Sequence, residues 1–424
     1  MTSPERRPTE LHLYHWTDLT IIGVAIAALA SGFGQFGATA ALGDVAKAFG
    51  HVTGGASVRD EAGLSGTVLG VGLAVIRLAS LGGLALAGLA DRWGRRKTLL
   101  TTAAVGLAVT VAAAGSPGYW WFVALFALGR PFLSATNAVA QVTGAEQTSS
   151  ADRAKAVALI AAAYAVGGGL TAELHSLARG VLGFRGVFAL AIVPLALLPL
   201  VARWIKEPDR FAVAASSRHH SMPVLGAVAP QFRARLATLS LLAFAVSVIT
   251  GPANTFVFIY AQNVLKMAGW LTGLMVAIAG VLGLAGLLVG RWLADNIGRR
   301  PTCALAIVAM AGTACFAYSG GQTALLVGYV LGVLAGAIFA PGYGAMLNEV
   351  FPTGVRASAA GWQIAAGVLG AAAGLVVFGA VADAGAWGTA AIATFTPMIA
   401  SVALFLLIPE TKGRELEELW PETT

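Results

Sequence analysis

The amino-acid sequence predicts an all-α membrane protein with twelve transmembrane helices in two related halves. Three observations predict this fold: an apolar composition, long apolar segments along the whole chain, and a motif that occurs once in each half. Of the 424 residues, 57% are hydrophobic and 11% are charged, whereas a soluble domain carries about 25% charged residues. A soluble protein of this composition would lack the polar side chains to cover its surface, so lipid is the expected solvent.

Twelve segments are long and apolar enough to cross about 30 Å of hydrocarbon as helices of ~20 residues. Short segments of alternating polarity, which would indicate a membrane β-barrel, are absent from the sequence. The first segment is too long for a signal-peptide core, so we expect it to be retained. The expected helices cover residues 19–42, 64–90, 98–115, 119–143, 154–176, 184–204, 237–262, 269–293, 302–318, 323–346, 358–382 and 386–408.

The placement of the basic residues predicts the orientation of these helices. Twenty of the 27 Lys and Arg residues fall in segments on the side of the N-terminus, and five fall on the opposite side. Because basic loops stay inside the cell, we expect a multi-pass protein of the plasma (inner) membrane with both termini cytoplasmic. The net charge of +7 then reflects topology and gives no reason to expect nucleic-acid binding.

No cofactor, metal or disulfide is expected. Cys303 and Cys315 lie on one predicted helix at a separation of about 18 Å, which is too far for a disulfide, and the sequence shows no zinc-ligand spacing. The histidines His219 and His220 lie in a polar linker without evident partners for catalysis. We therefore expect no enzyme. The expected partners are a small-molecule substrate and the lipid bilayer, with the monomer as the functional unit.

A motif that occurs twice, 204 residues apart, indicates an internal duplication. The first copy reads GLADRWGRRKT (residues 88–98), and the second reads LADNIGRRPT (residues 293–302). Each copy lies between two long apolar segments. Further pairs repeat at an offset of 203 residues: Glu146 and Glu349, Arg153 and Arg356, Glu207 and Glu410.

These repeats divide the chain into two six-helix bundles. The N-terminal bundle is predicted to cover residues 1–205, and the C-terminal bundle, with a short cytoplasmic tail, covers residues 236–424. The polar residues 206–235 between them are predicted to form a cytoplasmic linker.

The first copy of the motif resembles the signature loop of the major facilitator superfamily (MFS). The second copy, the Glu–Arg pairs and the segment PETKG (residues 409–413), which is similar to the sugar-porter branch, fit the same resemblance over the whole chain. The resemblance implies the MFS fold and a secondary transporter. In such a transporter two helical bundles rock around a midplane site, so that access alternates between the two sides of the membrane.

The resemblance also implies a gate at the cytoplasmic face. Asp91, at the end of the second span, would meet the positive N-terminal end of the eleventh span, and Asp295 would face the fifth. These clusters would join the halves when the cavity opens outward. The alternative is that the charges only mark the inside of the membrane, which is our interpretation for Arg92, Arg96 and Lys97. The predicted gate residues are Asp91, Arg95, Glu146, Arg153, Asp295, Arg299, Glu349 and Arg356.

Two arginines, Arg77 and Arg130, lie at the centres of the second and fourth predicted spans. A charged side chain there is costly and normally faces a polar interior or a pathway. Because no Asp or Glu lies mid-span to neutralise them, we predict an anionic organic substrate such as a carboxylate. The alternative is that both arginines bond backbone carbonyls and only hold helices together. Ser134 replaces the glycine of the superfamily's span-four arginine motif, so that motif is only partly present.

Polar side chains at helical spacing extend the predicted substrate site. Arg130, Ser134 and Asn137 share one face of the fourth span, and Gln35 belongs to a polar stripe on the first. The predicted substrate-binding residues are Arg77, Arg130, Gln35, Ser134, Asn137, Asn254 and Gln363.

Coupling and direction of transport stay open at this stage. Glu173 and His175 on the fifth span form the only close acid–histidine pair within a predicted span and are the predicted proton-coupling residues, although uniport and anion exchange are alternatives. A drug or metabolite exporter is a second prediction, but residues 167–169 are three glycines without the Gly-Pro motif of exporters. Further alternatives are a sugar-type solute–proton symporter and a transport-like sensor without flux.

Overall fold

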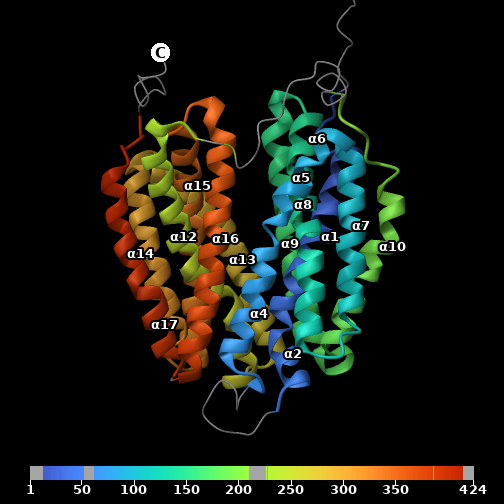
Figure 1. Cartoon of the computed structure of the whole chain (residues 1–424), viewed down its shortest axis with the longest axis vertical. Helices are drawn as coiled ribbons and strands as arrows, with labels where there is room; N and C mark the ends of the chain where they lie inside the picture. The colour runs from blue at the N-terminus through green and yellow to red at the C-terminus, as the bar shows by residue number, and fades with distance from the viewer. Residues whose placement is uncertain (1–12, 52–61, 210–225, 227, 385, 414–424) are drawn as a thin grey trace, which may run out of the picture.

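The computed structural model describes residues 13–51, 62–209, 226, 228–384 and 386–413, and almost all of them are helical (Figure 1). Runs rich in Ala and Leu favour helix, and in lipid a helix satisfies its own backbone hydrogen bonds. The helices are α1 (Leu19–Ala40), α2 (Leu42–Phe49), α4 (Gly66–Ala79), α5 (Gly82–Gly88), α6 (Ala90–Trp93), α7 (Arg95–Ala113), α8 (Tyr119–Gln147), α9 (Ser150–Ala189), α10 (Ile192–Val201), α12 (Pro230–Ile259), the π-helix η1 (Tyr260–Val264), α13 (Gly269–Asn296), α14 (Arg299–Ala317), α15 (Gln322–Glu349), α16 (Thr353–Ala384), α17 (Trp387–Phe395) and the 3-10 helix η2 (Thr396–Leu407).

Eleven helical segments of the described chain are long and apolar enough to span a membrane. The predicted all-helical, multi-pass class is therefore confirmed. The predicted third span, residues 98–115, forms α7 but is not among the eleven, because three basic residues open this helix and threonines lower its hydropathy. The count of twelve and the cytoplasmic placement of the termini remain predictions.

Several predicted spans consist of more than one helix. The second predicted span comprises α4, α5 and α6, and the twelfth begins as α17 and ends as the 3-10 helix η2. Helix α9 continues beyond the predicted fifth span into the sixth, with a break at Gly183, where φ is 57°. Glycine allows this positive φ without steric cost. The chain can therefore turn at Gly183 and continue as helix toward α10.

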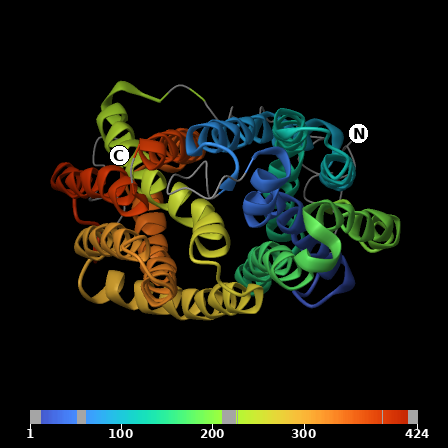
Figure 2. The ribbon, with the colours of Figure 1, turned by 90° about the horizontal axis from the view of Figure 1, so that it is seen from below.

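The helices form two bundles that lie side by side with their long axes roughly aligned (Figures 1 and 2). One bundle contains α1 to α10, and the other contains α12 to η2. Within the first, α1 packs along α9 and α7 along α8; within the second, α12 packs along α16 and α14 along α15. The proposed limits of 1–205, 206–235 and 236–424 remain predictions, because residues 210–225 and 227 lie outside the described part.

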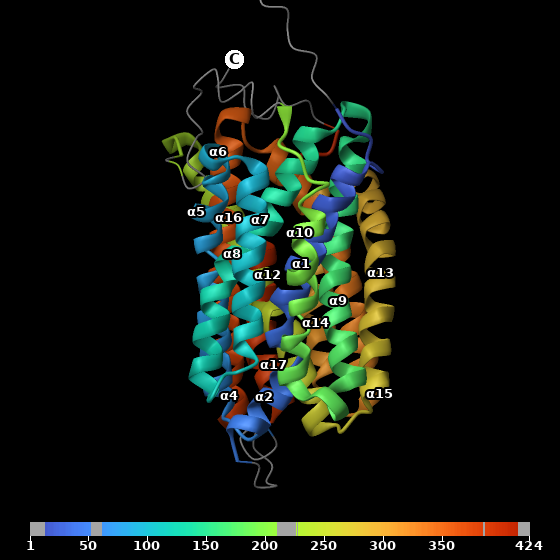
Figure 3. The ribbon, with the colours of Figure 1, turned by 90° about the vertical axis from the view of Figure 1, so that its right-hand side faces the viewer.

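Helices α1 and α9 lie side by side (Figure 3), and their contact depends on glycine. A Cβ atom on Gly32 would lie 2.0 Å from the carbonyl oxygen of Tyr164, and one on Gly167 would lie 2.0 Å from the carbonyl oxygen of Leu29. Small residues let helix backbones approach in lipid, where van der Waals packing drives association. The glycines thus hold α9, and with it Tyr164, directly against α1.

The two bundles meet at one end, where glycines again let backbones cross. A Cβ atom on Gly66 of α4 would lie 2.5 Å from the carbonyl oxygen of Gly379 of α16, and the reverse distance would be 2.1 Å. A Cβ atom on Gly269 of α13 would lie 2.0 Å from the carbonyl oxygen of Ser176 of α9. We call this the closed end. The opposite end, which carries the repeated motif and α6, is the loop end (Figure 1).

Candidate functional site

The two mid-span arginines share one cavity between the bundles. Its volume is about 60 Å³. Both arginines and Gln35, three of the predicted substrate-binding residues, line it, and no carboxylate does. We call it the arginine cavity. The lining residues are Gln35, Phe36, Ala38, Thr39, Leu73, Ile76, Arg77, Arg130, Tyr164, Thr255 and Leu375.

Neighbouring helices hold Arg130 in place without neutralising it. Its Nη1 donates to the backbone carbonyl of Gln35 at 2.9 Å. The Gln35 side chain donates to Ser31 at 2.9 Å, and Ser31 donates to the carbonyl of Leu133 at 2.7 Å. The buried Nε of Arg130 has no hydrogen-bond partner among the described residues. A carbonyl dipole compensates part of the desolvation of a guanidinium, but it does not cancel the charge.

Arg77 is the less constrained of the two arginines. Within the described part of the chain its guanidinium makes no hydrogen bond or ion pair. It also lines a second cavity of about 220 Å³, whose other lining residues belong to α12 and α16. The α16 residues of this second cavity are Ile364, Gly367, Val368 and Ala371, which precede the crossing at Gly379. The space beside Arg77 therefore continues along α16 toward the loop end.

The structure places the other predicted substrate residues outside the lining of the arginine cavity. Ser134 packs against α5, where a Cβ atom on Gly83 would lie 2.8 Å from its Cβ. The Oδ1 atom of Asn137 is buried without a partner in the described chain. Asn254 lines a separate cavity and donates to the carbonyl of Thr250 at 2.9 Å. Gln363 accepts a hydrogen bond from the hydroxyl of Tyr343.

Three polar residues of the arginine cavity, Thr39, Tyr164 and Thr255, are not among the predicted substrate-binding residues. Tyr164 is a single hydroxyl in an apolar run, which gives no periodic signal. Thr255 directly follows the predicted Asn254, and one residue turns a helix by about 100°. The correct segment of the seventh span was therefore predicted, but its rotation was not.

At the loop end of the first bundle, Arg95 forms ion pairs with two carboxylates. Its guanidinium lies 2.5 Å from Asp91 and 3.0 Å from Glu146. The side chain of Glu207 accepts hydrogen bonds from the backbone N–H groups of Arg95 and Arg96, the first two residues of α7. Arg153, another predicted gate residue, donates to the carbonyl of Ala145 at 3.2 Å.

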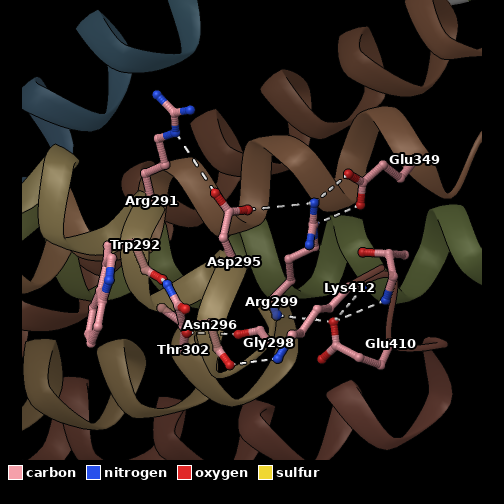
Figure 4. Close-up of polar contacts among 11 residues, drawn as sticks. Arg291, Trp292, Asp295, Asn296, Gly298, Arg299, Thr302, Glu349, Glu410 and Lys412 are labelled. Atoms are coloured by element: carbon pink, nitrogen blue, oxygen red, sulfur yellow. Dashed lines mark hydrogen bonds and ion pairs between the residues drawn. The ribbon is translucent and has the colours of Figure 1, made fainter. Parts of the chain in front are cut away.

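The second bundle repeats this arrangement (Figure 4). Arg299 lies 2.8 Å from Glu349 and 3.9 Å from Asp295. Glu410 accepts hydrogen bonds of 3.0 Å from the backbone N–H groups of Arg299 and Arg300, at the start of α14. Arg356 donates to the carbonyl of Phe351 at 3.3 Å. In this conformation Asp91, Arg95 and Glu146 form one cluster, and the second bundle has the equivalent cluster of Asp295, Arg299 and Glu349. The predicted gate residues Arg153 and Arg356 donate to backbone carbonyls instead.

Glycine is required at one position of each motif copy. Gly94 and Gly298 have φ values of 95° and 125°, where a side chain would be strained. A Cβ atom on either would also lie 2.9 Å from an oxygen of Glu207 or Glu410, respectively. The repeated glycine and the repeated glutamate therefore belong to one structure, in which the chain turns tightly so that the glutamate can cap the following helix.

The predicted proton-coupling residues lie near the closed end. His175 is fully buried, and its Nε2 lies 3.1 Å from Asp44 of α2. Glu173 points to the other bundle, where its Oε2 would be 2.2 Å from a Cβ atom on Gly273 of α13. Its buried Oε1 has no hydrogen-bond partner among the described residues. The histidine thus pairs with Asp44, and the glutamate faces the interface between the bundles.

A family comparison agrees with this geometry. The model of the Major Facilitator Superfamily matches residues 24–319 and 272–422, which together cover most of the chain. The chain belongs to the major facilitator superfamily. It is therefore a multi-pass membrane transport protein and not an enzyme.

Similar proteins of this superfamily include two named as transporters of small molecules. A protein of Haemophilus influenzae named as a metabolite transport protein is 28% identical over 353 residues, covering 80% of this chain and 86% of the relative. A protein of Cupriavidus pinatubonensis named as a 4-methylmuconolactone transporter is 25% identical over 374 residues, covering 85% of this chain and 84% of the relative.

Solved structures of the superfamily share the fold. The chain superposes on the E. coli xylose transporter XylE in its inward-open conformation with a TM-score of 0.73 and 19% identity, over 95% of this chain and 98% of that one. It superposes on a D-xylose–proton symporter with a TM-score of 0.74 and 20% identity, over 93% and 99% of the two chains. At this identity the likeness concerns the fold alone.

The cap at the start of α14 predicts a pH-dependent contribution to stability. Partial burial opposes ionisation of Glu410, but hydrogen bonds from the backbone of Arg300, Lys412, Arg299 and Thr411 outweigh it and lower its pKa below the ordinary 4.5. A lowered folded-state pKa gives stability that is present above the unfolded-state pKa and is lost as the pH falls through the folded-state value.

Thermal unfolding in detergent between pH 7 and pH 3 measures this contribution. We expect Glu410→Gln to lower the unfolding temperature at pH 7 and to approach the wild type at the acidic end of the range. A difference between the two proteins that is constant across the range would contradict the role of the carboxylate.

Proposed function

We propose that this protein moves a small organic anion across the membrane by alternating access, with Arg77 and Arg130 as the residues that bind it. The supporting observation is the arginine cavity, where two guanidinium groups lie between the bundles and no carboxylate lines the space. An arginine at mid-membrane costs about 3 kcal/mol on insertion scales. A negatively charged ligand would offset that cost, whereas a neutral ligand would not.

The chemistry of the cavity suits a carboxylate on an apolar body. Guanidinium groups bind carboxylates through two parallel hydrogen bonds, and both Arg77 and the Nε of Arg130 retain donors without partners in the described chain. The hydroxyl groups of Thr39, Tyr164 and Thr255 offer neutral contacts, while the remaining lining residues are mostly apolar. The name of one relative, a 4-methylmuconolactone transporter, is consistent with a small organic solute.

Uptake into proteoliposomes tests this assignment. In a screen of small organic anions, we expect Arg77→Ala and Arg130→Ala to reduce uptake of the transported anion at least tenfold, because each removes a charge-assisted contact of about 1.5–3 kcal/mol. The matched control is Arg203→Ala, which removes an exposed arginine near the end of the first bundle and should transport like the wild type. Equal uptake by the wild type and both cavity variants would sink the proposal.

The conformation suggests how the cavity is reached. The bundles touch at the closed end, and the space beside Arg77 continues toward the loop end. If the loop end is cytoplasmic, as the basic loops indicate, this conformation is open to the cytoplasm. We propose that the gate clusters of the two bundles join when the protein opens to the other side. The alternative role as topology markers predicts no effect on flux.

The gate is tested at Asp91. In Asp91→Asn we expect normal membrane insertion but slower transport, because the carboxylate could no longer bind the positive N-terminal end of a helix in the other bundle. The readouts are the amount of folded protein in the membrane and the initial rate of uptake. Wild-type flux in this variant would leave the loop charges as topology markers.

We also propose that His175, Asp44 and Glu173 bind the proton if transport is proton-coupled. The buried His175 lies against the partly exposed Asp44, and opening of the closed end would separate Glu173 from Gly273 and admit water. Other charged or titratable groups described toward this end include Lys47 of α2, His51, Lys266 before α13, Tyr260 of η1 and Asp383 of α16. Arg185 of α9 donates to two backbone carbonyls there.

A pH gradient tests the coupling. We expect an inward proton gradient to accelerate uptake in the wild type, and His175→Gln with Glu173→Gln to abolish that acceleration while exchange without a gradient continues. Lys47→Gln, at an exposed site of α2, serves as the control and should keep the response. A wild type that ignores the gradient would favour uniport or anion exchange.

Three other functions remain candidates. An exporter of drugs or metabolites would use the same cavity in the opposite direction, and a sugar-type solute–proton symporter would transport neutral solutes in the screen above. A sensor without flux would bind ligand in the cavity but show no uptake. We propose the plasma membrane as the location and the monomer as the functional unit.

A further inference from the structure

An aspartate of the second bundle caps a helix of the first bundle at the closed end. Asp383, near the end of α16, accepts hydrogen bonds from the backbone N–H groups of Gly66 at 2.5 Å and Thr67 at 2.8 Å. It also accepts one from the Thr67 hydroxyl at 2.6 Å. Gly66 and Thr67 are the first two residues of α4. The partners are more than 300 residues apart in sequence, so the contact depends entirely on how the two bundles meet.

Together with a local cap, Asp383 completes the hydrogen bonding of the first turn of α4. The side chain of Ser65 accepts from the N–H group of Val68 at 3.2 Å, and its carbonyl accepts from Leu69. The first N–H groups of a helix have no partner within the helix and carry partial positive charge. Ser65 caps α4 from within its own bundle, whereas Asp383 does so only while the bundles touch.

Next to this cap, the backbones of α4 and α16 cross in direct contact. Gly66 and Gly379 approach so closely that a Cβ atom on either would overlap the carbonyl oxygen of the other. A Cβ atom on Gly70, one turn further along α4, would lie 2.3 Å from the carbonyl oxygen of Leu375. Leu375 also lines the arginine cavity. Separation of α4 from α16 would therefore break the cap and open the cavity at the closed end in one movement.

We propose that Asp383 is a conformation-dependent latch that stabilises the state closed at this end. Its carboxylate binds the positive N-terminus of α4 only in that state, so the bond adds to the closed population and nothing to the open one. The gate expected at the loop end uses the same two segments, since Asp91 follows α4 and α5 in the second span. The second span and α16 would then carry one latching carboxylate near each end, and the two would engage in alternate states.

Distance measurements between spin labels test the latch without any substrate. Labels at Lys47→Cys of α2 and Thr323→Cys of α15, in a Cys303→Ala/Cys315→Ala background, report the separation of the bundles at the closed end. Both positions are exposed. In Asp383→Ala we expect the ratio of separated to closed molecules to rise about tenfold, the size of a partly buried carboxylate–helix interaction. Asp383→Asn keeps an acceptor without the charge, so its rise should be smaller.

The matched control is Ser65→Ala, which removes the cap from the same turn of α4 but within one bundle. It should leave the distance distribution of the wild type unchanged, because Ser65 caps α4 in both states. A wild-type distribution in Asp383→Ala, or an equal shift in Ser65→Ala, would overturn the latch. If Asp383→Ala cannot be purified as folded protein, Asp383→Asn decides: an unchanged distribution overturns the proposal. Because no transport is measured, the result is independent of the proposed substrate.

Discussion

The structure depends on one requirement of helices: the free N–H groups at a helix start need acceptors from outside the helix. Carboxylates from distant parts of the chain meet this requirement three times. Glu207 binds the start of α7, Glu410 the start of α14, and Asp383 the start of α4. Each cap joins segments that are far apart in sequence. The first two hold a bundle together, and the third connects the two bundles.

The arginine cavity shows the opposite use of charge. Where the caps pair negative carboxylates with positive helix ends, Arg77 and Arg130 lie in a cavity whose lining contains no carboxylate. The cavity is sealed toward the closed end by the crossing of α4 and α16, and the space beside Arg77 extends along α16 toward the other end. Strong pairing is thus found at the ends of the bundles, and unpaired positive charge is found between them.

Much of the fold could be predicted from the sequence because lipid imposes long apolar helices, and because the duplication shows itself at a constant offset. The depth of Arg77 and Arg130 in two spans made both of them predicted substrate-binding residues, and the structure brings them to one cavity. The residues that line this cavity were harder to predict. Ser134 and Asn254 are at the right depth in their spans, but their side chains do not face the cavity. Asp383 gave no signal, because its partners are backbone groups that no sequence pattern marks.

The placement of Glu207 and Glu410 has a consequence for the architecture of the chain. Each glutamate follows the last helix of its bundle and closes back on the third predicted span of that same bundle. Every partner of each signature loop described above therefore lies within one polypeptide half. A chain divided within the linker would yield two fragments that each retain a complete loop structure, so the protein is suited to reconstitution from separately synthesised halves.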